Sequence, residues 1–213
     1  MKVLSVKVTD YKSIEDSGVV QIEPITCIVG KNESGKTSLL EALTKVNPLT
    51  KMHTAFALED YPRNKLNAYK KVHEEQPADA VKAVFEFSAD EKKVLEEKFG
   101  RGILKSNTVT VTKGYDNKLS ILIETSVAAH ARFITGREVD LGEFKNSLKT
   151  NSFSELRASL EAIADPNASV KRVLGEVLAL EKKTLFELVW AHVKAEFLPK
   201  FFILMSIRRF RAA

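Results

Sequence analysis

The chain has 213 residues, a formal net charge of +5 and 44% hydrophobic residues. These values are ordinary for a soluble globular protein and allow one domain plus an appendage. Its single cysteine, Cys27, excludes an internal disulfide framework. No apolar run reaches about 18 residues and no signal peptide opens the chain, so we expect no membrane contact and a cytoplasmic location. The positive charge permits contact with nucleic acid without requiring it.

Three strand patterns open the chain. Leu4, Val6 and Val8 alternate with polar residues, and residues 19–22 give a second pattern after a turn. Residues 25–29 are apolar at nearly every position, which is typical of a central strand covered on both faces. We therefore expect a buried strand there, with Cys27 as a small buried residue.

A helix is predicted next, from Thr37 to about Val46, with a buried stripe of Leu39, Leu40, Leu43 and Val46. Residues 49–79 are polar and irregular. A strand follows at residues 81–87, and residues 88–91 form a capping-box pattern before a helix that Gly100 ends. Residues 108–112 and 119–124 predict a hairpin.

Residues 126–197 are largely helical in pattern, with a second capping box at residues 152–155 and a break at residues 165–167. One helix carries Val170, Val173, Val177 and Leu180 at 3-4-3 spacing, which indicates a buried seam. We predict an N-terminal lobe over residues 1–125, a helical insertion or arm over residues 126–200, and an atypical tail over residues 201–213.

The strongest motif is a phosphate-binding loop. Residues 30–37 match G-x-x-x-x-G-K-[ST] and lie between a predicted strand and a predicted helix. Glycines allow such a loop to turn its N–H groups toward phosphate oxygens, Lys36 would contact the β- and γ-phosphates, and Thr37 would bind Mg²⁺. A solvated Gly-Lys loop is the alternative.

Residues 11–14, Tyr-Lys-Ser-Ile, and the loop sequence Gly-Lys-Asn-Glu-Ser-Gly-Lys-Thr-Ser at residues 30–38 together resemble the ABC-type ATPases of DNA maintenance. That family includes structural-maintenance-of-chromosomes (SMC) proteins, RecF-like proteins and the overcoming-lysogenization-defect (OLD) nucleases. The sequence also resembles bacterial AAA family ATPases related to OLD nucleases, in which Asp-Tyr-Pro-Arg, here residues 60–63, likewise follows the first helix. The resemblance is specific over residues 1–65 and weak beyond residue 125.

The resemblance implies an α/β P-loop fold with an opening hairpin and a mixed sheet around a P-loop strand and helix. It implies ATP and Mg²⁺ as ligands, DNA as a partner, a homodimer in full-length relatives, and a role in DNA repair or phage defence. The implied nucleotide-binding residues are Lys12, Gly30, Lys31, Asn32, Glu33, Ser34, Gly35, Lys36, Thr37 and Ser38. The alternative to nucleotide binding is a solvated turn residue for Lys12 and a loop-forming residue for Asn32.

Hydrolysis in this family also needs a strand ending in Asp-Glu and a Leu-Ser-Gly-Gly signature, and the sequence shows neither. We therefore expect a truncated fragment whose residues from about 203 are a frameshifted tail, or else a short basic strand or nucleic-acid contact. A nucleotide-binding module without turnover, or an inert gene remnant, is the competing function. A P-loop kinase is the third candidate, against which the long opening hairpin argues.

Other polar residues carry weaker signals. Asp60 and Arg63 fit an ordinary loop ion pair better than a catalytic pair. The four histidines show no metal-ligand spacing with one another or with Cys27. His192 is interpreted as a packing residue with its hydrogen bonds satisfied.

Overall fold

The computed structural model describes residues 1–31, 34–46, 55–138, 141–142, 144–182 and 184–197. These residues form two compact units. The first comprises residues 1–86 and 108–122, and the second comprises residues 87–107 and 123–197. Within the described ranges, no helix is long and apolar enough to cross a membrane.

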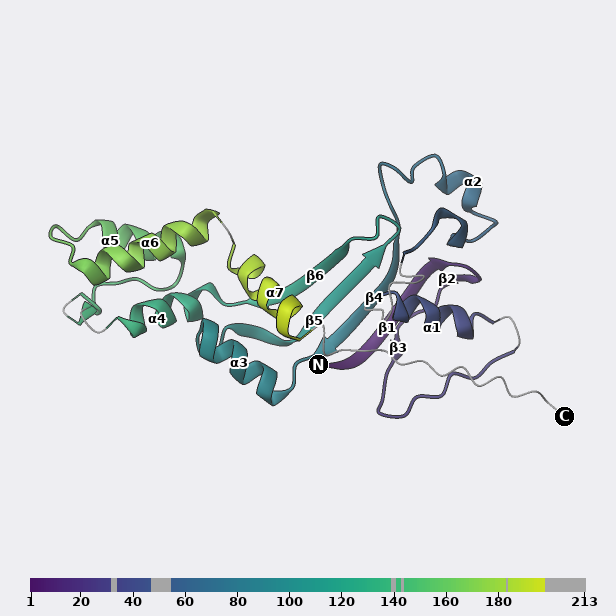
Figure 1. Cartoon of the computed structure of the whole chain (residues 1–213), viewed down its shortest axis with the longest axis horizontal. Helices are drawn as coiled ribbons and strands as arrows, with labels where there is room; N and C mark the ends of the chain where they lie inside the picture. The colour runs from purple at the N-terminus through teal and green to yellow at the C-terminus, as the bar shows by residue number, and fades with distance from the viewer. Residues whose placement is uncertain (32–33, 47–54, 139–140, 143, 183, 198–213) are drawn as a thin grey trace. The chain divides into compact units, whose positions relative to one another are not determined.

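A six-stranded sheet in the order β2-β1-β4-β5-β6, with β3 also paired to β1, organises the first unit (Figure 1). β1 pairs antiparallel with β2, β3 and β4, and β4 pairs antiparallel with β5. The strands are β1 (Lys2–Tyr11), β2 (Ile14–Asp16), β3 (Val20–Gln21), β4 (Asp79–Glu86), β5 (Leu104–Gly114) and β6 (Leu119–Thr125). The predicted opening hairpin and the later hairpin are therefore confirmed.

One face of this sheet is apolar because alternate residues of each strand point to it. Val8, Ala83 and Val111 are all 1% exposed or less. Helix α1 (Lys36–Thr44) contacts β1 and β4 and buries Leu39, Ala42 and Leu43. Val46, just beyond the helix, is buried as predicted, whereas Leu40 is only half-buried.

The segment between α1 and β4 is more ordered than its polar sequence predicts. It contains the short 3-10 helix η1 (Leu58–Asp60) and the single-turn helix α2 (Leu66–Tyr69). Tyr61 and Tyr69 stack with ring centroids 3.8 Å apart, and Tyr115 contacts both rings. Aromatic pairs of this kind add to the stabilisation from the area that they bury, and they fix the segment against the unit.

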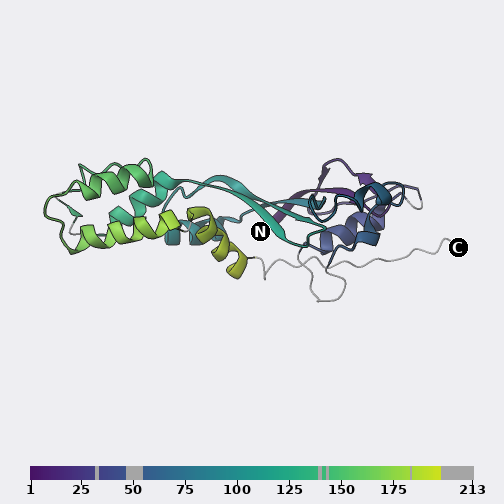
Figure 2. The same ribbon diagram turned by 90° about the horizontal axis from the view of Figure 1, so that it is seen from above.

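Residues 126–197 of the second unit are largely helical, as their pattern predicts, and the unit also includes α3. Its helices are α3 (Ala89–Phe99), α4 (Val127–Arg137), α5 (Phe153–Glu161), α6 (Ala168–Lys182) and α7 (Leu185–Glu196). α5 and α6 lie side by side in both views (Figure 1 and Figure 2). Val170, Val173 and Val177 on α6 pack into a buried core with residues of α4 and α5, so the predicted seam is confirmed.

The predicted helix ends can be checked from their hydrogen bonds. Ser88 and Glu91 form the expected capping box, and Gly100 ends α3 with φ +106°. On α3, however, Val94 is 42% exposed and does not share the buried stripe of Leu95 and Phe99. At α5 only half of the predicted box is present: the Ser152 hydroxyl accepts from Glu155 N–H, while the Glu155 carboxylate accepts from Asn151.

One expected strand is wrong. Residues 25–29 form no strand, Ile25 and Val29 are 87% and 88% exposed, and Cys27 is exposed. An apolar run is buried as a strand only where other strands pair with it, and no strand of the described residues pairs with this one. The α/β class is confirmed, with this exception in front of the P-loop.

Candidate nucleotide site

The P-loop leads directly into α1. Gly35, the residue before the helix, has φ +85°, and it offers no side-chain cap to the first turn. The first bond of the helix runs from Leu39 N–H to the Gly35 carbonyl. The N–H groups of Lys36, Thr37 and Ser38 belong to the first turn, where helix geometry leaves them without intrahelical partners. A helix end of this kind favours an anion.

Lys36 folds back over the loop. Its ammonium donates to the carbonyl of Gly30 at 2.8 Å, to that of Lys31 at 2.5 Å, and to the Ser34 hydroxyl at 3.4 Å. The cation is therefore held above the loop by neutral oxygens. A phosphate oxygen carries a negative charge and is the stronger acceptor for an ammonium group.

Two glycines permit the close packing of this loop. A Cβ on Gly30 would lie 2.8 Å from the Ser34 hydroxyl oxygen, and a Cβ on Gly35 would lie 2.8 Å from Cγ1 of Ile14. Gly35 also has the left-handed backbone that glycine adopts without penalty. The turn between β1 and β2 thus packs directly against the loop.

The loop opens onto a cavity of about 380 Å³, lined by Ser13, Ser34, Gly35, Lys36, Thr37 and Ser38. Five of these are predicted site residues, and Ser13 is an addition. Asn32 and Glu33 lie outside the described residues. The nearby tripeptide Tyr-Lys-Ser is the sequence signal that could have identified Ser13.

Magnesium fits this cavity in part. The exposed Thr37 offers one hydroxyl oxygen, and Mg²⁺ in nucleotide sites commonly keeps waters and phosphate oxygens as its other ligands. Among the described residues, no group of three or more His, Cys, Asp or Glu side chains could hold a metal ion. With a nucleotide bound, Thr37 would supply a protein ligand to the ion.

Lys12 lies in the two-residue turn between β1 and β2, with φ +53°. Its amide donates to the Asp60 carbonyl at 2.6 Å, and its ammonium forms an ion pair with Glu41 of α1. Burial acts to lower the pKa of Lys12, but the hydrogen bond and charge of Glu41 outweigh it and raise the pKa. Lys12 is adjacent to Ser13 but does not line the P-loop cavity.

Asp60 pairs with Lys45 and not with Arg63, so the predicted loop ion pair is wrong. The Lys45 ammonium lies 3.2 Å from the Asp60 carboxylate and donates to the Ala55 carbonyl at 2.5 Å. Only 9% of Lys45 is exposed, and an ammonium that is buried to this extent needs such partners. Arg63 is exposed and lines a cavity of about 690 Å³ that also contains Lys12, Ser13 and Asn64.

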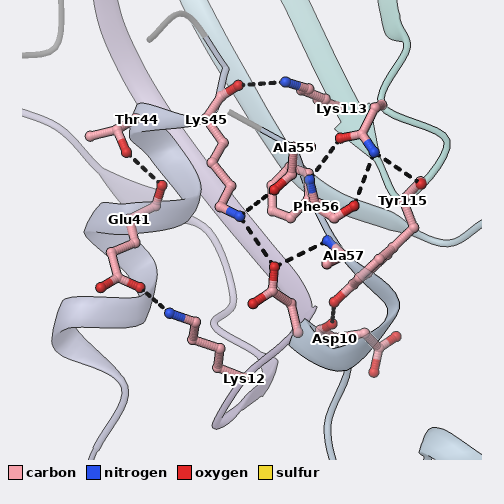
Figure 3. A network of polar contacts seen from close by, with 12 residues as sticks. Asp10, Lys12, Glu41, Thr44, Lys45, Ala55, Phe56, Ala57, Lys113 and Tyr115 are labelled. Atoms are coloured by element: carbon pink, nitrogen blue, oxygen red, sulfur yellow. Dashed lines mark hydrogen bonds and ion pairs between the residues drawn. The ribbon is translucent and has the colours of Figure 1, made fainter. Parts of the chain in front are cut away.

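A second set of contacts fixes the other end of α1 (Figure 3). The buried Lys113 of β5 donates to the Lys45 carbonyl at 2.9 Å. Burial, and then the charge of Lys45, lower the pKa of Lys113. The Asn117 side chain accepts from Phe56 N–H at 2.7 Å and donates to the Phe56 carbonyl at 2.9 Å. These contacts join the β5–β6 turn to the segment that follows α1.

Tyr115 completes this network. Its hydroxyl donates to the Asp10 carbonyl at 2.6 Å, beside the turn that carries Lys12. Burial raises the pKa of Tyr115, as it raises the pKa of Tyr11 to about 12, so both phenols stay neutral. No local motif marks Lys45, Lys113, Asn117 or Tyr115 in the sequence, because their partners lie far along the chain.

The histidines of the second unit are packing residues. The ring of His130 is buried, and its Nδ1 donates to the Phe99 carbonyl at 2.7 Å. Burial lowers the pKa of His130. His192 packs beside Phe99 and Phe197, but its buried Nε2 has no hydrogen-bond partner among the described residues. The expectation that its hydrogen bonds are satisfied is therefore wrong for this nitrogen.

Residues 1–185 match a protein family described as the AAA ATPase domain. The chain belongs to the AAA ATPase domain family. The match spans the P-loop, the sheet and α3 to α6. No protein with a curated function matches the sequence.

Among solved structures, the AAA ATPase chain is similar to one from work on ATP-driven dimerization and DNA-stimulated activation of SMC ATPases. The two are 14% identical, with a TM-score of 0.36, and the similarity covers 84% of this chain and 99% of the other. A superposition of this quality carries no argument about the site. The ATPase assignment therefore depends on the family match and on the geometry of the P-loop.

Proposed function

We propose that this AAA ATPase domain binds ATP with Mg²⁺ at residues 30–38. The observation that carries the proposal is the convergence of the Lys36 ammonium and the first turn of α1 on one cavity of about 380 Å³. The phosphates would lie on the N–H groups of Lys36, Thr37 and Ser38, and the Lys36 ammonium would exchange its carbonyl partners for phosphate oxygens.

We place the nucleoside on the side of Lys12. Ser13 lines both the P-loop cavity and the larger cavity that contains Lys12, so the two cavities adjoin at this residue. Lys12 would contact the nucleotide only if its ammonium shared or left Glu41. Both side chains are about 40% exposed, so solvent or a ligand can reach this ion pair.

Binding is tested by titrating ATP into the full chain by calorimetry, with and without Mg²⁺. We expect Lys36→Ala to weaken binding at least about tenfold, because it removes a charge-assisted contact. Lys92→Ala, an exposed lysine on α3, serves as the control and should leave binding unchanged. Wild-type protein that binds no nucleotide, or a Lys36→Ala variant that binds normally, would refute the proposal.

We further propose that the chain belongs with the OLD, RecF and SMC-like ATPases and shares their action on DNA. The support is the paired Tyr-Lys-Ser-Ile and P-loop sequences, together with the contact between Ile14 and Gly35 that joins them. Phosphate release with and without linear DNA, and gel filtration with and without ATP, test action on DNA and ATP-dependent dimerisation. Binding without turnover would instead favour a regulatory nucleotide-binding module.

A further inference from the structure

The helical unit contains an apolar cavity to which four of its helices contribute. Its volume is about 500 Å³, and side chains of α3, α4, α6 and α7 line it. The larger apolar side chains of the lining are Phe99, Phe133, Ile134, Leu180 and Leu188. Small-molecule sites are commonly clefts of about 300–1,000 Å³, lined mainly by apolar and aromatic side chains with a few polar groups. The cavity has the size and the lining of such a site.

One cation of the lining has no carboxylate partner among the described residues. Lys98 is exposed, and its ammonium there has a single hydrogen-bond partner, Nδ1 of His192 at 3.1 Å. Burial, and then the charge of Lys98, lower the pKa of His192, so the ring is neutral and Nδ1 accepts the bond. A neutral ring nitrogen leaves the charge of Lys98 uncompensated, and a carboxylate would be the stronger acceptor.

The second cation of the lining, Arg137, uses only part of its hydrogen-bonding capacity. Its Nη2 donates to both carboxylate oxygens of Glu176, at 2.9 and 2.8 Å, and its guanidinium lies 5.0 Å from the centroid of the Phe133 ring. Within the described residues, Nε and Nη1 of Arg137 donate to no acceptor. A guanidinium has five N–H donors, so those on Nε and Nη1 remain for another anion. With Lys98, Arg137 and Glu176 charged and the buried His130 neutral, the described lining carries one net positive charge.

We infer that this cavity binds a small carboxylate with an apolar aromatic body. The body would displace water from the rings of Phe99 and Phe133, and the carboxylate would accept from Lys98 and from the remaining N–H groups of Arg137. One negative charge on the ligand matches the single net positive charge of the lining. All of the lining residues belong to the second unit, whereas the P-loop belongs to the first, so this site is separate from the proposed nucleotide site.

Binding is tested by titrating 2-naphthoate into the full chain by calorimetry, with 2-naphthamide as a neutral ligand of nearly the same shape. We expect the carboxylate to bind at least about tenfold more tightly than the amide, because only the carboxylate forms charge-assisted hydrogen bonds. Lys98→Met removes one cation and keeps an apolar stem, so it should weaken naphthoate binding about tenfold and leave amide binding nearly unchanged. Lys92→Met is the matched control, because Lys92 is exposed on the same helix and does not line the cavity.

A second pair of variants tests the apolar part of the cavity. Ala179 lines the cavity and is exposed on α6, so the larger side chain of Ala179→Trp would fill the opening without entering the core. This variant should bind both ligands at least about tenfold more weakly, because it occupies the apolar space that the aromatic body needs. Ala158→Trp, at an exposed position of α5 outside the cavity, should bind both as the wild type does.

Several results would overturn the proposal: no binding of naphthoate to the wild type, equal affinity for naphthoate and naphthamide, or unchanged naphthoate binding by Lys98→Met. Self-association of the wild type that Ala179→Trp abolishes and Ala158→Trp does not would assign the cavity to a second copy of the chain, and would also overturn it. Lys36→Ala should weaken nucleotide binding and leave naphthoate binding unchanged, since Lys36 contacts only the P-loop. The two sites are therefore tested separately.

Discussion

Gly35 of the P-loop packs against the opening hairpin, and its replacement by alanine should show how much free energy this close packing contributes. The backbone at Gly35 is left-handed, with φ +85°, and a Cβ there would lie 2.8 Å from Cγ1 of Ile14 and 3.3 Å from the Ser13 hydroxyl oxygen. The left-handed backbone alone costs an L-residue about 1–2 kcal/mol. Forcing an extra carbon against a packed side chain costs about 1–3 kcal/mol more. We therefore expect Gly35→Ala to lower the free energy of unfolding by roughly 2–5 kcal/mol.

Gly18 provides a matched control, because it has φ +63° but no atom within 4 Å of the point where a Cβ would lie. Gly18→Ala should incur the backbone cost alone, about 1–2 kcal/mol. Both variants are compared with wild type by urea unfolding without nucleotide. The difference between their unfolding free energies measures the contact of residue 35 with the hairpin. Because no nucleotide is present, it contains no effect on ligand binding.

A double-mutant cycle then tests the contact itself. Ile14→Ala removes Cγ1 and leaves a small cavity, so it destabilises the protein when made alone. In the double variant the new Cβ of residue 35 occupies the space that Cγ1 has left, and the combined cost should be less than the sum of the two single costs. Strict additivity, or equal costs for Gly35→Ala and Gly18→Ala, would refute the close approach of hairpin and loop.

Three further predictions concern the network behind the site and the helical unit. Asn117→Gly keeps the left-handed backbone (φ +59°) but removes both bonds to Phe56, and urea unfolding should show a loss of about 2–3 kcal/mol; Asn117→Ala should lose more. Lys45→Met should lower the unfolding free energy by about 1–3 kcal/mol, because Asp60 and the Ala55 carbonyl lose their partner, whereas the exposed Lys70→Met should change little. For His130, burial lowers the folded-state pKa, so the unfolded chain binds the proton more readily and the free energy of unfolding falls as the pH drops through about 6.5. Urea unfolding measured at pH 7.5 and 5.5 should show this loss, at most about 1.4 kcal/mol per pH unit. His130→Gln should reduce the loss.

Local patterns in the sequence predict the elements around the site better than they predict the long-range contacts that support them. The helix after the P-loop and the capping box at Ser88 each depend on residues within a few positions of one another, and both are present. The buried seam of α6 is confirmed for the same reason, since its period is set by one helix. Spacing along the chain is sufficient where the partners are close in sequence.

The network around Lys45 shows where such patterns stop. Lys45 and Lys113 lie 68 positions apart, a separation that no helical or strand period connects, and Asn117 reaches Phe56 over 61 positions. A spacing of three residues favours a pair between Asp60 and Arg63, yet the buried ammonium of Lys45 offers Asp60 a better-shielded partner. The fold, and not the spacing along the chain, decides which cation Asp60 meets.

The strand expected at residues 25–29 gives the same lesson in a different form. Its composition is typical of a buried strand, but a strand is buried only where neighbouring strands pair with it, and the composition of the run does not show whether they do. In the described residues the sheet is completed by β4, β5 and β6 on the far side of β1, and none of these pairs with the apolar run. The exposed side chains of Ile25 and Val29 therefore show a strand-like composition that lacks, within the described residues, the pairing partner that would bury it.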